Sequence, residues 1–320
     1  MHRVILRAII GVLIALVTAS CTNQATQQPG GTGGGNITPV FAFTEALVGT
    51  NRIAIGLLRD GSPINDPQAQ VHLRFFDLTG SDAATTDEKD ATYYGQGLPA
   101  GIYVAYTNFA KPGTYGVEIS VKTAGQTEAS SARYQLDVKS ESAAPQVGQP
   151  AISTKTLTVN DVPDVSHLSS GPSPDPALYQ VSLDQALTSG KPIALLFATP
   201  NFCRTATCGP SVQVLSQLQK KYGDRMVFIH TEVYKYPFGD SFKQQTEALA
   251  AAETAGRAPT ADELHAGMSD AMVAWGLPSE PWLFLIDGKG VIAARYEGGI
   301  TSEEIGPAID ALLAGKPIGS

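Results

Sequence analysis

The sequence predicts a multi-domain chain in which a β-rich unit at 38–140 precedes an α/β unit at 176–320. Three observations support this division. Apolar and polar residues alternate through the first unit, which is typical of strands with one buried face. Strand-like and helix-like periods follow one another through the second unit. The stretch between them, 141–175, is rich in proline, serine and alanine, as linkers often are.

The composition is that of a globular protein. The chain has 320 residues, enough for two units that each bury a core, and 43% of its residues are hydrophobic while 16% are charged. The formal net charge of −8 argues against nucleic acid as a partner, because phosphate backbones are bound by basic faces.

The N-terminus has the features of a secretory signal. His2, Arg3 and Arg7 precede an apolar run at 8–17, and the small residues at 18–20 follow it. The apolar run is too short for a mature membrane span, which needs roughly 20 residues. The chain is therefore expected to be exported.

Cys21 directly follows Ala19 and Ser20, an arrangement that resembles the lipobox of bacterial lipoproteins. The resemblance implies that residues 1–21 are a signal peptide ending at a lipidated Cys21. The protein would then be extracytoplasmic and anchored by lipid to the bacterial cell membrane or outer membrane. Residues 22–37 are polar and rich in glycine, so we expect a flexible tether. An ordinary cleaved signal with an incidental cysteine is the alternative.

Short strands are predicted throughout the first unit. Alternating apolar residues, with intervening turn sequences rich in Gly, Pro and Asp, indicate an antiparallel β-sandwich without helices. The clearest alternating segments are 53–57, 71–75, 115–121 and 134–138.

The segment Pro112-Gly-Thr-Tyr115 resembles the tyrosine corner of immunoglobulin-like sandwiches, in which a tyrosine hydroxyl bonds to the backbone. The stretch 51–138 also resembles small extracytoplasmic sandwich modules, some of which are associated with copper proteins. These resemblances imply an immunoglobulin-like β-sandwich. His72 lies on the polar side of its strand and is expected to be solvated. We therefore predict that the unit is a spacer or docking module.

The linker at 141–175 is expected to be semi-rigid because of its prolines. One strand, 156–159, is expected to lie against either unit.

The second unit alternates between strands and helices and ends in a hairpin and a helix. This is an α/β order with parallel and antiparallel edges. Its segment 248–252 is expected to be an inserted helix. The predicted elements are helix 183–188, strand 193–197, helix 211–222, strand 226–233, helical region 241–274, strand 282–286, strand 291–296 and helix 302–313.

A cysteine pair, Cys203 and Cys208, lies where the first strand of this unit turns into a helix. Together with the order of elements, this resembles the thioredoxin fold over 176–320. A second match is Trp275-Gly-Leu-Pro-Ser-Glu-Pro281, which resembles the segment before the third strand of thioredoxins. The resemblance implies that Pro281 is the family's cis-proline and faces the cysteines. A cis bond before proline costs little, so the position is physically available.

Helix geometry constrains the cysteine pair. Residues five apart in a helix point about 140° away from one another, and their Cα atoms lie beyond the ~7 Å limit for a disulfide. If the two cysteines bond, at least one of them therefore lies in a loop. Gly209-Pro210 predicts that the helix begins there, because proline is favoured at the first helical position. Cys208 would then lie beside free backbone N–H groups that lower its pKa.

Two alignments with thioredoxins assign different roles to the cysteines. Aligned on Phe202 and Cys203, the stretch is a thioredoxin cysteine pair with two extra residues between. Aligned on Cys208, it is a dithiol motif in which Ser211 replaces the second cysteine. The second alignment explains the helix start better. It favours Cys208 as nucleophile and Cys203 as resolving thiol, in exchange with thiols or disulfides of extracytoplasmic proteins.

The sequence departs from thioredoxins at three points. The first strand and its flanks, 191–199, carry no carboxylate, and Phe202 replaces a tryptophan. Glu280 precedes Pro281, where an apolar residue is common. A redox-inactive binding protein with a structural disulfide is therefore one alternative to an enzyme.

A copper-binding or assembly module is the other alternative. The stretch from Phe197 to Pro210, which reads Phe-x4-Phe-Cys-x4-Cys-x-Pro, also resembles the copper-binding loop of Sco-type assembly factors, and two thiolates with an imidazole suit copper. The stretch 278–281, where that family carries its histidine, has none. His230 is then the candidate third ligand beside Cys203 and Cys208, although a core or surface role is preferred for it. Thiol exchange without a cofactor is the preferred function.

Overall fold

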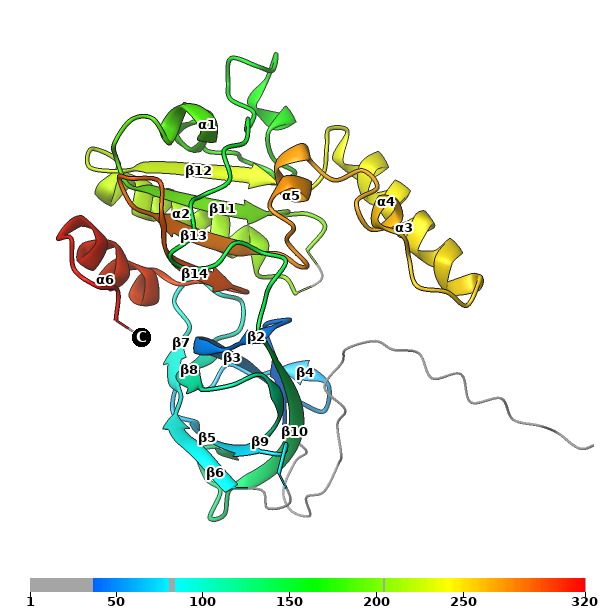
Figure 1. The fold of residues 1–320 in the computed structure, drawn as a ribbon, viewed down its shortest axis with the longest axis vertical. Coiled ribbons are helices and arrows are strands. Elements are labelled where there is room, and N and C mark those ends of the chain that lie inside the picture. Colours follow the sequence, from blue (N-terminus) through cyan, green and yellow to red (C-terminus); the bar gives the residue numbers. More distant parts are fainter. Residues whose placement is uncertain (1–36, 81–83, 204, 320) are drawn as a thin grey trace, which may run out of the picture.

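The computed structural model describes residues 37–80, 84–203 and 205–319, which form two units stacked end to end (Figure 1). The expected signal peptide, the lipidation site Cys21 and the tether up to residue 36 lie outside the described residues. Within the described residues, no helix has the length and apolar character that a membrane crossing requires.

The first unit is built from two five-stranded sheets, which confirms a β-rich N-terminal region. One sheet has the order β1 (Ile37–Phe41), β3 (Gly49–Arg59), β8 (Ile102–Phe109), β7 (Thr92–Tyr94), with β4 (Ser62–Pro63) paired to β3. The other has the order β2 (Ala46–Leu47), β10 (Ser130–Lys139), β9 (Gly113–Lys122), β5 (Gln70–Asp77), β6 (Ala84–Asp90).

The two sheets share one apolar core, and period-two alternation supplies its side chains. Ile53 and Ile55 of β3 lie with Phe75 of β5 and Val117 of β9 within this core, and each of these side chains is almost completely buried. Tyr115 donates a hydrogen bond from its hydroxyl to the carbonyl of Lys111 at 3.2 Å, which is the bond a tyrosine corner requires. The immunoglobulin-like assignment itself stays a prediction.

The second unit contains a four-stranded sheet in the order β12 (Val227–Glu232), β11 (Ile193–Ala198), β13 (Trp282–Ile286), β14 (Ile292–Glu297). Strands β11 and β12 are parallel, whereas β13 runs antiparallel to both β11 and β14. The helices are α1 (Leu183–Ala186), α2 (Cys208–Tyr222), α3 (Phe238–Thr254), α4 (Ala261–Leu264), α5 (Asp270–Ala274) and α6 (Ser302–Leu313), with 3₁₀ turns at Val165–His167 and Pro176–Tyr179.

Helices cover both faces of this sheet, which explains why β11 is apolar without alternation. Leu196, Ala194 and Ala198 share one face and pack with α2 and α6. Leu195 and Phe197 point to the opposite face and pack with α1 and α5. The two buried layers hold β11 at the centre of the sheet, and the cysteine loop begins where β11 ends.

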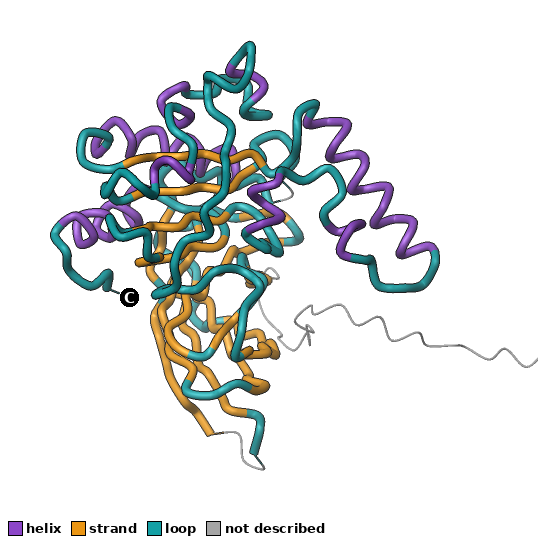
Figure 2. Tube along the Cα trace, turned by 45° about the horizontal axis from the view of Figure 1, so that its top comes forward, coloured by secondary structure: helices purple, strands orange, loops and turns teal. Residues whose placement is uncertain are grey.

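Helix α3 forms a single helix of 17 residues that leads away from the body of the unit (Figures 1 and 2). The predicted inserted helix at 248–252 is part of it. Only Phe238, Gln245 and Ala252 of α3 are buried. Gln245 connects the helix to the body, because it accepts a bond from the Tyr234 hydroxyl at 2.7 Å and donates to the carbonyl of Leu264 at 2.5 Å.

The stretch predicted as a linker lies against the α/β unit instead of spanning open space. Its residues Gly148 and Gln149 exchange backbone hydrogen bonds with Ile292 at 2.8 and 2.9 Å. The hydroxyl of Thr156 accepts a bond from the backbone N–H of Leu183 at 3.0 Å, and its own N–H donates to Ser182 at 2.9 Å. The strand expected at 156–159 does not form; the N–H of Thr156 bonds a side chain, and that of Val159 bonds the carbonyl of Tyr179 at 3.0 Å outside any sheet.

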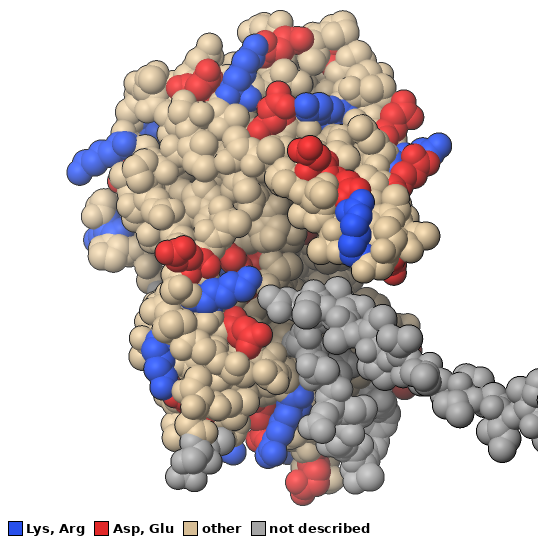
Figure 3. All heavy atoms as spheres, turned by 45° about the vertical axis from the view of Figure 1, so that its right-hand side comes forward, with Lys and Arg blue, Asp and Glu red and all other residues tan. Residues whose placement is uncertain are grey.

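Figure 3 shows one face of both units with the charged side chains coloured. Lysines and arginines lie singly or beside aspartates and glutamates on the described part of this face. Charges of both signs are interspersed, so no single-signed patch forms there.

A buried ion pair joins the two units. Arg52 on β3 donates from Nε and Nη2 to the carboxylate of Glu304 on α6 at 2.6 and 2.8 Å, and the two side chains are 6% and 3% exposed. The guanidinium also donates to the carbonyls of Glu297 and Gly299 at 2.6 and 3.0 Å. Tyr106 donates to Glu304 at 2.9 Å. Each of the two charges is thus satisfied by groups of the other unit.

Replacement of this arginine should destabilise the protein strongly. In Arg52→Ala the carboxylate of Glu304 stays buried without its partner, and breaking a buried pair costs about 3–5 kcal/mol. Guanidinium denaturation measures the change. The matched control is Arg133→Ala, which removes a pair with Glu118 whose arginine is 79% exposed; exposed pairs are worth about 0–1 kcal/mol. Equal midpoints for the two variants would contradict the role given to Arg52.

Candidate thiol site

The two cysteines lie at the carboxyl end of β11, on either side of a short loop. Cys208 is the first residue of α2 and is completely buried. Cys203 lies in the loop and is partly exposed. The helix begins three residues before the predicted Ser211, with Thr207 as its N-cap. Cys208 therefore lies at the N-terminus of the helix, as expected.

The sulfur of Cys203 accepts hydrogen bonds from its surroundings. The backbone N–H of Cys208 donates to Cys203 Sγ at 3.3 Å, and the hydroxyl of Thr205 lies 3.3 Å from the same sulfur. Thr205 and Thr207 are themselves joined at 2.8 Å between their hydroxyls. Both cysteines are free thiols in this structure. The loop thus folds back so that donors at the helix start point at Cys203.

These contacts make the two thiols very different acids. A hydrogen bond from the Cys208 thiol, together with the Thr205 hydroxyl and the backbone N–H groups, outweighs burial and lowers the pKa of Cys203 to about 5. Burial raises the pKa of Cys208 far above its ordinary value, and the adjacent Cys203 adds to the effect. The expectation that Cys208 is the more acidic thiol is therefore wrong. The N-terminus of α2 does supply hydrogen-bond donors, but its first N–H, that of Cys208, points at the sulfur of Cys203.

Pro281 forms a cis peptide bond with Glu280, as the resemblance to thioredoxins implied. It directly precedes β13, in which Trp282 pairs with Phe197 near the end of β11. Glu280 lies close enough to Cys208 for its charge to contribute to the raised pKa of that thiol. Pro281 itself is buried.

His230 lies in the core and is not placed to hold a metal. Tyr179 bonds its Nδ1 at 2.5 Å, and Nε2 bonds the carbonyl of Ala198 at 3.1 Å, so both ring nitrogens have partners. Burial lowers the pKa of His230 to about 4. Within the described residues, no three or more His, Cys, Asp or Glu side chains are grouped to hold a metal ion. The copper alternative that combines His230 with Cys203 and Cys208 does not fit this geometry.

A buried carboxylate that the sequence analysis missed lies under the cysteine loop. Glu232 ends β12 in register with Ala198, the last residue of β11. Its oxygens accept the backbone N–H groups of Ser170 at 2.7 Å and Val233 at 3.1 Å, while Ser170 Oγ accepts from Asn201 in the loop at 3.1 Å. Burial raises the pKa of Glu232. The carboxyl ends of neighbouring parallel strands lie at the same edge of a sheet. The sequence could therefore have placed Glu232, at the end of one predicted strand, next to the loop that follows the other.

Aromatic side chains border the loop on the side of α3. Phe202 stacks on Phe242 with ring centroids 5.0 Å apart, and Tyr234 packs edge-on against both rings. Along the same chain segment, Tyr236 is 52% exposed and stacks on His167 at 3.9 Å. We call these five residues the aromatic face. It gives the site an apolar border that a polypeptide could contact.

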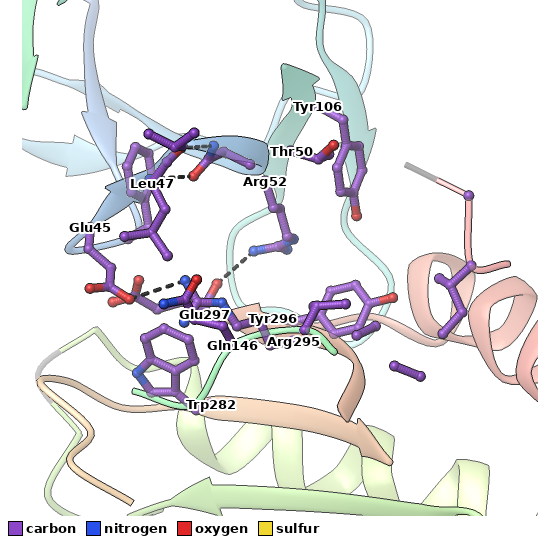
Figure 4. A pocket seen from close by; sticks show the side chains of 18 residues that line it. Glu45, Leu47, Thr50, Arg52, Tyr106, Gln146, Trp282, Arg295, Tyr296 and Glu297 are labelled. Atoms are coloured by element: carbon purple, nitrogen blue, oxygen red, sulfur yellow. Dashed lines mark hydrogen bonds and ion pairs between the residues drawn. The ribbon is translucent and has the colours of Figure 1, made fainter. Parts of the chain in front are cut away.

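A separate cavity of about 450 Å³ lies between the two units. Figure 4 shows Arg52, Arg295 and Glu297 around it, with Trp282 at its base. Arg295 pairs with Glu45 at 3.1 Å and stacks over Trp282, and the other two side chains also have partners. The charges that line this cavity are therefore satisfied within the protein and do not by themselves select a ligand.

Residues 179–313 match the model of the thioredoxin-like domain, so the chain contains such a domain. None of the curated proteins matches the chain. Among solved structures, the PmoD soluble domain from Methylocystis sp. ATCC 49242 (Rockwell) is 17% identical, with 37% of this chain and 99% of that chain covered and a TM-score of 0.21. Superoxide reductase (neelaredoxin) from Ignicoccus hospitalis is 12% identical, with 32% and 79% covered and a TM-score of 0.21. With TM-scores this low, neither the fold nor the function of these two proteins can be assigned to this chain.

The acidity of the two thiols can be measured directly. In the reduced protein, thiolate absorbance should appear with a midpoint near pH 5, and Cys203→Ser should abolish this step. Cys208→Ala should raise the midpoint toward the ordinary cysteine value of about 8.5, because the sulfur loses the thiol donor. Since the folded pKa of Cys203 is depressed, the stability from its thiolate should be lost as pH falls toward 5. A low-pH step that survives Cys203→Ser would contradict the assignment.

Proposed function

We propose that the protein carries out thiol–disulfide exchange on extracytoplasmic proteins, with Cys203 as attacking thiol and Cys208 as resolving thiol. The observation that supports this proposal is the unequal environment of the pair. Cys203 is partly exposed and its pKa is lowered to about 5, whereas Cys208 is buried and keeps its proton. The thiolate is the nucleophile in such reactions, so the roles are the reverse of those favoured by the sequence alignment.

In the first step, the Cys203 thiolate attacks one sulfur of a substrate disulfide. A mixed disulfide forms, the substrate S–S bond breaks, and the second substrate sulfur leaves as a thiolate that takes a proton from water. Cys203 then carries no charge and no longer holds the Cys208 proton by a hydrogen bond. Both effects had raised the pKa of Cys208, so its acidity increases at this point.

In the second step, Cys208 releases its proton to water and its sulfur attacks the Cys203 sulfur of the mixed disulfide. The mixed disulfide breaks, the internal Cys203–Cys208 disulfide forms, and the substrate sulfur leaves as a thiolate that takes a proton from water, which completes the substrate dithiol. Two electrons have passed from the protein to the substrate. An external dithiol protein returns the pair to the reduced state, and the same steps in reverse oxidise a substrate dithiol.

We also propose that Cys21 carries lipid and that a flexible tether holds both units outside the cytoplasm. The basic N-terminus, the short apolar run at 8–17 and the small residues before Cys21 support this proposal. The bond from Tyr115 to Lys111 supports the finer assignment of the β-rich unit as an immunoglobulin-like sandwich.

The resolving variant should trap substrates. Cys208→Ser lacks the second thiol, so it should accumulate mixed disulfides with oxidised insulin, detectable by non-reducing gels and mass spectrometry. Cys203→Ser should form none, and only the wild type should speed the reduction of insulin by dithiothreitol. A wild-type potential well below about −300 mV, together with no exchange, would instead indicate a structural disulfide and contradict the proposal.

The lipid anchor is tested by Cys21→Ala in the full chain expressed in a bacterial host. The wild type should incorporate labelled palmitate and sediment with membranes, and the variant should do neither, because the acceptor thiol is gone. Cys203→Ser is the matched control and should retain the label. An unlabelled wild type would point to an ordinary cleaved signal.

A further inference from the structure

A chain of hydrogen bonds leads from the β-rich unit to the loop before Pro281. Thr44 donates from its backbone N–H and its hydroxyl to Glu297 Oε1 at 2.9 and 2.6 Å. Ser279 donates to the same oxygen at 2.5 Å and accepts from the indole N–H of Trp282 at 2.9 Å. The Ser279 hydroxyl is therefore bonded to both Glu297 and Trp282, and its partner Glu297 is in turn bonded to Thr44 of the β-rich unit.

Glu297 needs these donors because it is buried. Only 9% of the residue is exposed, and burial raises the pKa of its carboxyl group. A buried carboxylate is costly unless it is hydrogen-bonded, and two of the three donors to this oxygen come from Thr44. The adjacent Gly298 donates its N–H to the carbonyl of Pro281 at 2.9 Å. Docking of the β-rich unit and the position of the Pro281 loop are thus linked.

A second contact reaches the start of α2. A Cβ atom added to Gly299 would lie 3.2 Å from Cγ2 of Thr207 and 3.4 Å from Cδ1 of Leu98. Gly299 is therefore packed between the N-cap of α2 and a side chain of the β-rich unit, with no space to spare. Thr207 directly precedes Cys208, whose N–H donates to the Cys203 sulfur.

We propose that the β-rich unit is a positioning element of the thiol site, with Thr44 holding the loop before Pro281 and Leu98 holding the start of α2. This inference goes beyond the expected spacer or docking role, and it rests on the proposed thiol exchange for its kinetic test. Thr44 and Leu98 act through Glu297 and Ser279 on one side, and through Gly299 and Thr207 on the other.

The two contacts should have different consequences. Loss of the Thr44 hydroxyl frees the loop that carries Glu280, so binding of a protein disulfide should weaken while the acidity of Cys203 stays the same. Loss of the Leu98 side chain loosens the start of α2, so the N–H bond to Cys203 should weaken and the pKa of that thiol should rise.

The test uses the full chain, with variants at three positions of the same interface. Thr44→Val should raise the KM for oxidised insulin about tenfold with little change in kcat, because misplaced binding groups cost binding energy. Its reaction with a small aromatic disulfide should be unchanged, and Thr44→Ser should restore the KM. Leu98→Ala should raise the Cys203 midpoint by about half a unit or more and slow its alkylation by iodoacetamide at about pH 6. Glu45→Gln weakens the pair with Arg295 in the same interface and should leave all readouts at the wild-type level.

The inference would be overturned if Thr44→Val and Leu98→Ala both kept the wild-type KM for insulin, the wild-type pH midpoint of Cys203 and the wild-type alkylation rate. Equal changes in Glu45→Gln would also overturn it, because they would reflect loosened docking in general. If the wild type shows no exchange with insulin, the proposed function fails, but thiolate titration and alkylation of Leu98→Ala still test the positioning role.

Discussion

The guanidinium of Arg52 crosses the boundary between the two units and forms two hydrogen bonds with the carboxylate of Glu304. Neither charge could be buried if the units were apart, since each would lose the partner that offsets its desolvation. The same guanidinium binds the carbonyls of Glu297 and Gly299, at the corner where β14 leads toward α6. A residue of the first unit therefore binds the backbone of the second unit next to Gly298, whose N–H donates to the carbonyl of Pro281.

The cysteine pair shows that proximity to a helix N-terminus does not decide which thiol is acidic. Cys208 is the first residue of α2, yet its N–H points at the sulfur of Cys203. The hydroxyls of Thr205 and Thr207, which lie between the cysteines in sequence, are joined to each other, and that of Thr205 also contacts the Cys203 sulfur. The stabilised thiolate is the sulfur that accepts the donors, and the buried donor keeps its proton. The two thiols of one short stretch thus differ in acidity, with the pKa of Cys203 lowered and that of Cys208 raised.

Much of the fold was predictable because it depends on local pattern. Strand 282–286 and helix 302–313 have the predicted bounds, and the cis bond before Pro281 followed from a motif. The linker was not predictable in the same way. Its polar composition resembles a free spacer, but the Thr156 hydroxyl and neighbouring backbone groups find partners only on the folded α/β unit. The buried carboxylate was missed for a related reason, since Glu232 reaches the cysteine loop from the neighbouring strand.

The sequence by itself determined the two units, through period-two alternation in one and mixed periods in the other, and the thiol pair at a strand-to-helix turn. These features depend on residues close together along the chain, whose spacing sets which face is buried. The tertiary structure decided which thiol is acidic, why His230 is unavailable to a metal, and how the β-rich unit meets the site. These depend on contacts between distant residues, such as Arg52 and Glu304, which are 252 positions apart. No local pattern encodes which of the buried donors will point at a given sulfur or carboxylate.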